Sequence, residues 1–433
     1  MTGLSTGRAG AAADLSTVEV VQRRTTRALV TSQVAGGLGV ASGGSVGALM
    51  AADVMGREDL AGLVQSSQVL GAALLALPAA RLALSSGRRS GLSLGYGLAA
   101  FGCVLAVVAA QIPSFPLLLV GTALFGGGTT AGLQARYAAT DLAKPERRGR
   151  ALGLVVWATT VGGVIGPNLV DPAGWFGEQV GIERLAGPFL LSAAMLLVGT
   201  LVVQFGLRPD PLLLARSLQV PVEAGPGRRR RGVLHSGLTA MSRSPRALLG
   251  LVAVVVAHTV MVSVMVMTPI HMDHGHASLR VIGFVISVHI AGMFAFSPVM
   301  GWLSDSIGRI PVVAGGGVAL LGAVALSGTS AEGHSVGLTF GLFLLGLGWS
   351  ACLVAGSTLL TESVPVEARP AAQGSSDLLM GLAAAGGGGL AGVVVGTLGF
   401  GVLNAGAAVL VVALLLATAL PAARVRRAVT VRS

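Results

Sequence analysis

Two matching stretches of sequence decide the fold of this 433-residue chain: TDLAKPERRGRALG at residues 140–153 and TESVPVEARPAAQG at residues 361–374. They align without a gap at an offset of 221 residues, and the same offset carries Gly87-Arg88 onto Gly308-Arg309. Two separate loops that share one offset indicate an internal duplication. We therefore expect a chain built from two structurally similar halves.

The composition around these stretches is that of a membrane protein. Apolar residues make up 53% of the chain and charged residues only 11%. A soluble chain of this length needs a far more charged surface. Apolar blocks recur along the chain, each near the ~20 residues that cross a bilayer as a helix. We predict an all-α polytopic membrane protein with twelve transmembrane helices in two pseudo-symmetric six-helix bundles.

The positions of arginine and lysine predict the topology. Basic residues gather in alternate loops, which is the positive-inside pattern and places both termini in the cytoplasm. The net charge of +11 therefore does not indicate nucleic-acid binding. The predicted order is a cytoplasmic tail, a six-helix bundle, a cytoplasmic linker with the run Arg228–Arg231, a second bundle and a cytoplasmic tail. These segments cover residues 1–26, 27–207, 208–246, 247–421 and 422–433.

A further stretch, residues 258–300, concentrates sulfur and imidazole side chains. It holds six of the twelve Met and five of the seven His in the chain. In Met261-x-x-x-Met265 and His289-x-x-x-Met293 the paired residues share one face of a helix. If the two segments are antiparallel neighbours, Met261 and His289 lie at similar depth. Thioether and imidazole groups suit Cu(I) better than Mg²⁺ or Ca²⁺, so one hypothesis is a copper pathway. The alternative is that Met fills the core as a flexible apolar side chain and a neighbouring helix satisfies the His.

The duplication bears on that choice. The offset of 221 residues places the four residues on Val40, Gly44, Gln68 and Ala72 of the first half. The scaffold therefore does not require sulfur or imidazole at these places, which weakens the interpretation as core filler.

Other residues are candidates for supporting roles. A metal ion could be taken up or released by His258, His271, Met272, His274, His276 and Met300. Asp377 is a carboxylate in a predicted span, and such groups are functional candidates, here for proton coupling. A polar turn without a ligand role, and an Asp377 that pairs with an arginine or caps a helix, are the alternatives.

The motif Gly301-Trp-Leu-Ser-Asp305-Ser-Ile-Gly308-Arg309 resembles the loop signature of the major facilitator superfamily. In that signature the Gly allows tight packing, the Asp accepts hydrogen bonds from a neighbouring helix N-terminus, and the basic residue completes a charge network. The copy in the first half departs from it, with Leu84 in place of the Asp. Gly162, Gly166 and Pro167 are similar to an antiporter motif of the superfamily, although such small-residue spacing is common in membrane helices. The resemblance implies a secondary transporter that works by alternating access, not an enzyme, without a cofactor.

A narrower resemblance concerns the Met and His pairs. CcoA-type bacterial copper importers carry Met-x-x-x-Met on helix seven and His-x-x-x-Met on helix eight, which here are Met261, Met265, His289 and Met293. The resemblance implies import of copper as Cu(I) across a bacterial plasma (inner) membrane. We expect a monomer whose partners are the bilayer and a small ion or small molecule. Proton-coupled export of a drug or natural product, and import of riboflavin or another small organic nutrient, remain alternatives.

Overall fold

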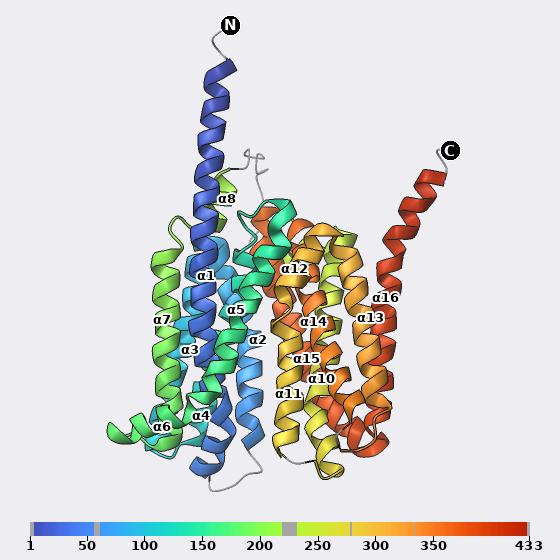
Figure 1. Ribbon diagram of the computed structural model, residues 1–433. Helices are drawn as coiled ribbons and strands as arrows, with labels where there is room; N and C mark the ends of the chain where they lie inside the picture. Colours follow the sequence, from blue (N-terminus) through green and yellow to red (C-terminus); the bar gives the residue numbers. More distant parts are fainter. Residues whose placement is uncertain (1–3, 56–60, 219–231, 278, 334, 431–433) are drawn as a thin grey trace.

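The computed structural model describes residues 4–55, 61–218, 232–277, 279–333 and 335–430, and this part of the chain is helical. Two bundles stand side by side, with both ends of the chain at the same end of the molecule (Figure 1). The first bundle consists of α1 (Leu4–Met55), α2 (Ala61–Ser86), α3 (Arg88–Gln111), α4 (Phe115–Ala138), η1 (Pro145–Arg147), α5 (Arg148–Asn168), α6 (Val170–Gln179), η2 (Arg184–Ala186) and α7 (Gly187–Gly206).

Two short helices, α8 (Pro211–Ser217) and α9 (Val233–Ser242), lie between the bundles in sequence. The second bundle consists of α10 (Pro245–His274), α11 (Leu279–Phe294), α12 (Ser297–Ser306), α13 (Arg309–Gly328), α14 (Val336–Glu362), η3 (Val366–Ala368), α15 (Arg369–Leu398) and α16 (Phe400–Thr430).

The helices match the expected membrane spans in number. Among the described residues, eleven helical segments are long and apolar enough to cross a membrane, and the bent first helix makes twelve. This confirms the predicted twelve-helix architecture.

Three details differ from the expected boundaries. Helix α1 begins at Leu4, so most of the expected tail continues the first span as a helix. A short turn between α11 and α12 interrupts the eighth span, and Pro298 lies in the first turn of the new helix. The expected linker contains α8 and α9, whereas the run Arg228–Arg231 lies outside the described residues.

The duplicated loops make duplicated contacts. Arg88 pairs with Asp141 at 2.7 Å (Nε to Oδ2), and Arg309 pairs with Glu362 at 2.8 Å (Nη2 to Oε1), each at the positions that the 221-residue offset relates. Gly87 and Gly308 precede α3 and α13 with φ of 88° and 97°. Only glycine adopts such values without strain, which explains the residue type at both places.

The two bundles are joined near the end that carries the termini. Helix α5 packs on α12 through Gly149 and Gly301, where a Cβ at Gly149 would lie 2.6 Å from the Gly301 carbonyl oxygen. Helix α2 packs on α15, and Ala73 and Ala76 share a small apolar cluster with Leu378. Helix α9 contacts both α2 and α15, so the linker also covers this junction.

Candidate functional site

A cavity of about 210 Å³ lies between the bundles, lined by α2, α4, α10 and α15. Its wall combines apolar groups with amides, hydroxyls, an imidazole and a carboxylate. The polar members are Gln65, Gln68, Thr129, Thr130, His258 and Asp377. Four of these were not predicted. The rarity of polar side chains in apolar spans is the signal that singles out the two glutamines.

At this cavity, Asp377 forms an ion pair that joins the two bundles. Its Oδ1 accepts a hydrogen bond from Arg136 Nη2 on α4 at 2.7 Å, and the side chains are 2% and 1% exposed. Arg136 Nη2 also donates to the Tyr137 hydroxyl at 3.1 Å. Arg136 Nε and Nη1 and Asp377 Oδ2 are buried without a hydrogen-bond partner among the described residues. Removing either partner of such a pair leaves an uncompensated buried charge.

The two site histidines are held in opposite tautomers. Trp349 Nε1 donates to His258 Nδ1 at 2.9 Å, so a neutral His258 carries its proton on Nε2 and has no free ring lone pair. His289 Nδ1 lies 2.9 Å from the Leu342 carbonyl oxygen. Because a carbonyl only accepts, Nδ1 is the protonated nitrogen of His289, and its Nε2 keeps a lone pair.

His289 Nε2 is fully buried and has no hydrogen-bond partner among the described residues. An unpaired buried polar atom costs about 1–3 kcal/mol, and an unoccupied ion site is one explanation for it. A backbone carbonyl that fixes one ring nitrogen and frees the other is also the arrangement that metal-ligating histidines use.

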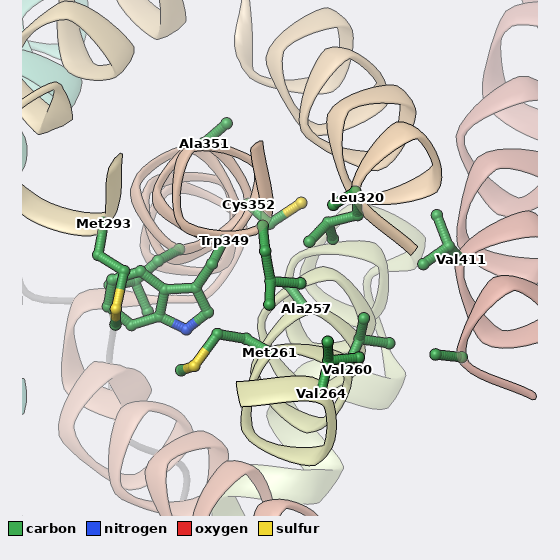
Figure 2. Packing of buried hydrophobic residues seen from close by; sticks show 14 of the residues in the cluster. Ala257, Val260, Met261, Val264, Met293, Leu320, Trp349, Ala351, Cys352 and Val411 are labelled. Atoms are coloured by element: carbon green, nitrogen blue, oxygen red, sulfur yellow. The ribbon is translucent and has the colours of Figure 1, made fainter. Parts of the chain in front are cut away.

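The predicted methionine ligands lie in the core of the second bundle. Met261 and Met293 belong to one buried cluster, and both extend toward the indole ring of Trp349 (Figure 2). Met265 is partly buried against the same cluster. Helices α10 and α11 each pack extensively on α14, which carries Trp349, and in the described residues they do not pack extensively on each other. The expectation that the two segments are direct neighbours is therefore wrong, because α14 lies between them. None of the four predicted ligands lines the cavity.

The remaining metal-handling candidates divide into packed and exposed residues. His271 stacks on the Phe400 ring with centroids 4.3 Å apart, and Met272 is fully buried. His274, the last residue of α10, and His276, just after it, are exposed at the end of the molecule opposite the termini (Figure 1). His274 Nδ1 is 3.9 Å from Glu332 Oε1, and His276 has φ of 58°. In the described residues, no group of three or more His, Cys, Asp or Glu is arranged to hold a metal ion.

Met300, the last of these candidates, lies on α12 and packs against the apolar cluster from the side. It is therefore a partly buried packing residue in this conformation.

The loop around Asp305 makes the contacts that the family resemblance implies. Asp305 accepts hydrogen bonds from the backbone N–H groups of Gly149 and Arg150, both at 2.9 Å, at the N-terminus of α5 in the other bundle. Arg309 Nη2 is 3.2 Å from Asp305 Oδ1, and Arg309 also pairs with Glu362. The negative carboxylate complements the positive end of the α5 dipole.

The motif of Gly162, Gly166 and Pro167 lies within α5 and packs that helix on α1. The Ser42 hydroxyl donates to the Gly166 carbonyl oxygen at 2.9 Å. A Cβ at Gly166 would lie 2.7 Å from Ala41 Cβ, and one at Gly162 would meet the backbone of Leu38. The glycines therefore allow close helix packing inside the first bundle.

Comparison with known proteins agrees with this arrangement. The model of the family described as Major Facilitator Superfamily matches residues 29–278 and 250–431. The chain belongs to the major facilitator superfamily. It is therefore a multi-pass membrane transporter that moves its cargo as a secondary transporter.

The chain is similar in sequence to two known transporters and similar in fold to a solved structure. An uncharacterised MFS-type transporter of Bacillus subtilis, YdeG, is 38% identical over 374 residues, which are 86% of each chain. The riboflavin transporter RfnT of Brucella anthropi is 30% identical over 342 residues, 78% of this chain and 80% of the relative. The structure of the proton:xylose symporter XylE has a TM-score of 0.71 at 14% identity, covering 92% of this chain and 95% of the symporter, and shows the shared fold.

Proposed function

We propose that this transporter imports copper as Cu(I). The observation that carries the proposal is the buried, unpartnered Nε2 of His289 in the bundle where Met261 and Met293 turn toward one indole ring. Imidazole nitrogen and thioether sulfur are ligands that suit Cu(I). Two or three such ligands without a thiolate bind firmly enough to replace the ion's hydration and loosely enough to release it, as conduction requires.

The size of the cavity supports a small cargo. Its volume of about 210 Å³ is below the roughly 300–1,000 Å³ typical of pockets for drug-sized ligands. This argues against export of a drug or natural product. His258 lines the cavity and accepts a hydrogen bond from Trp349, which belongs to the same buried cluster as Met261 and Met293.

The positive-inside pattern assigns the joined end of the bundles to the cytoplasm, so this conformation is the one that loads cargo from outside. Inward release then requires the contacts of Asp305 with α5 to break. Asp377 supplies a means of coupling, because a proton on its carboxylate weakens the attraction to Arg136 that joins the bundles.

Uptake of radioactive copper by cells that make the transporter tests the proposal. Met261→Leu removes the sulfur at nearly constant volume, and His289→Gln keeps a donor for the Leu342 carbonyl. We expect each change to lower the uptake rate by about tenfold, the factor that corresponds to 1.4 kcal/mol. Met241→Leu is the matched control. Met241 lies on α9 and is fully buried in a different cluster, which includes Ala247 at the start of α10. Unchanged uptake by both ligand variants would refute the ligand role.

Import of a small organic nutrient is the second candidate. The amides of Gln65 and Gln68, the hydroxyls of Thr129 and Thr130 and the N–H of His258 form a wall of hydrogen-bond donors and acceptors that suits such a molecule. The resemblance to a protein named as a riboflavin transporter points the same way. Rescue of a riboflavin auxotroph by the wild-type chain but not by Gln68→Leu, with copper uptake absent, would favour this function.

A further inference from the structure

Helix α6 lies apart from the transport site. It follows α5 and lies across the end of the first bundle opposite the termini, projecting to the side (Figure 1). Its inner face consists of the small residues Ala173, Gly174 and Gly177. Its outer face presents Trp175 and Phe176, which are 59% and 53% exposed. Large aromatic side chains at a span end are typical of the membrane–water interface.

A groove of about 320 Å³ runs along the line where α6 packs on the beginning of α7. Every residue that lines it is apolar or glycine, including Pro172 and Phe176 of α6 and Leu190, Leu191 and Ala194 of α7. Helix α7 belongs to a membrane span that begins at Arg184, so the groove lies at the depth where lipid chains meet their headgroups. A narrow apolar groove at that depth fits an acyl chain.

A cation stands close to this groove. Arg184 lies one turn before Gly187, which lines the groove, and its stem packs against Gly174, where a Cβ would be 3.0 Å from Arg184 Cγ. Its guanidinium is 3.5 Å from Asp171 Oδ1 and 3.5 Å from Glu178 Oε2. These pairs are long and exposed, and such pairs contribute little. A phosphate can therefore displace one of these exposed carboxylates and take two parallel hydrogen bonds from the guanidinium.

We propose that the groove between α6 and α7 is a phospholipid site. One acyl chain lies between Phe176 and Leu190, the phosphate contacts Arg184, and the Trp175 indole lies at headgroup level. The site is independent of the transported cargo, and it anchors the turn that connects the fifth and sixth spans to the leaflet at that end.

Native mass spectrometry of the full chain in detergent, titrated with phosphatidylglycerol, tests this site. We expect the wild type to retain one phospholipid with preference over further copies. Ala194→Trp fills the groove from an exposed position and should weaken this binding by about tenfold. Leu201→Trp is the matched control, because it adds the same indole on the same face of α7 two turns away, outside the groove.

A second variant tests the phosphate contact separately from the acyl-chain groove. Arg184→Gln should reduce the binding of phosphatidylglycerol to the level of diacylglycerol, which has the same chains without a phosphate. Equal phospholipid retention by the wild type and Ala194→Trp would overturn the proposal. So would a dimer of the wild type that Ala194→Trp dissociates, because a second copy would then be the occupant.

Discussion

In the first half of the transporter Arg88 pairs with Asp141, and in the second half Arg309 pairs with Glu362 at the equivalent positions. The neighbouring joint differs. Asp305 accepts two N–H groups from the start of α5, whereas its counterpart is Leu84. The counterpart of Gly149 is Pro370, which has no N–H to offer. The acceptor is thus missing together with one of its two donors, whereas Ala371, the counterpart of Arg150, keeps its N–H.

The linker supplies a different acceptor near Leu84. Asp210 Oδ2 accepts a hydrogen bond from the Arg89 backbone N–H at 2.8 Å, and the same carboxylate caps α8. The Arg89 N–H of the first half is therefore paired with its own linker, whereas Asp305 in the equivalent loop of the second half pairs with the opposite bundle. Arg88 Nη2 also donates to Gln373 Oε1 of α15 at 2.5 Å, so both copies of the loop contact the other bundle, but through different groups.

The halves also differ in the site. Gln68 and Ala72 line the cavity, whereas their counterparts His289 and Met293 are buried against α14. The first half thus supplies a hydrogen-bonding wall, and the second half supplies sulfur and imidazole behind it.

The largest expected effect comes from breaking the ion pair between the halves. Asp377→Ala leaves Arg136 buried and unpaired, and we expect a loss of stability of about 3–5 kcal/mol, measured by thermal unfolding in detergent. The double variant Arg136→Met with Asp377→Leu should recover most of this loss, because apolar side chains can replace a buried pair. A double variant as unstable as the single one would contradict the compensating role of the pair.

The duplicated ion pairs should respond unequally. Asp141 and Arg88 are almost fully buried, whereas Glu362 and Arg309 are 22% and 13% exposed. We expect Asp141→Ala to lower the free energy of unfolding by about 3 kcal/mol, and Glu362→Ala by about 1 kcal/mol. Equal losses would show that the two copies have the same surroundings.

An expected effect of intermediate size concerns the joint at α5. Asp305→Ala removes two hydrogen bonds to a buried carboxylate and should cost about 2 kcal/mol. Leu84→Asp, the reciprocal change, should stabilise the other copy by less than this loss, since Pro370 has no N–H and Ala371 supplies only one donor. A gain as large as the loss in Asp305→Ala would show that the capping contact does not depend on that missing donor.

Much of the scaffold could be predicted from the sequence, because the repeated loops and apolar blocks are local signals. The glycines before α3 and α13 and the acceptor role of Asp305 follow from residue type and position. The partners across helices could not be predicted. Spacing within a helix gives the face on which Met261 and His289 lie, but not that α14 stands between their helices.

The histidine tautomers were equally beyond the sequence. They depend on the Leu342 carbonyl, 53 residues from His289, and on the Trp349 indole, 91 residues from His258. The pairing of Arg136 with Asp377 spans 241 residues and requires the two bundles to be in contact.

Copper K-edge X-ray absorption of the purified transporter loaded with Cu(I) tests the copper proposal most directly. We expect a two- or three-coordinate ion with sulfur and nitrogen neighbours, and loss of the nitrogen neighbour in His289→Gln. A copper ion with only oxygen and nitrogen neighbours, or a spectrum unchanged by His289→Gln, would contradict transport through the methionine and histidine cluster.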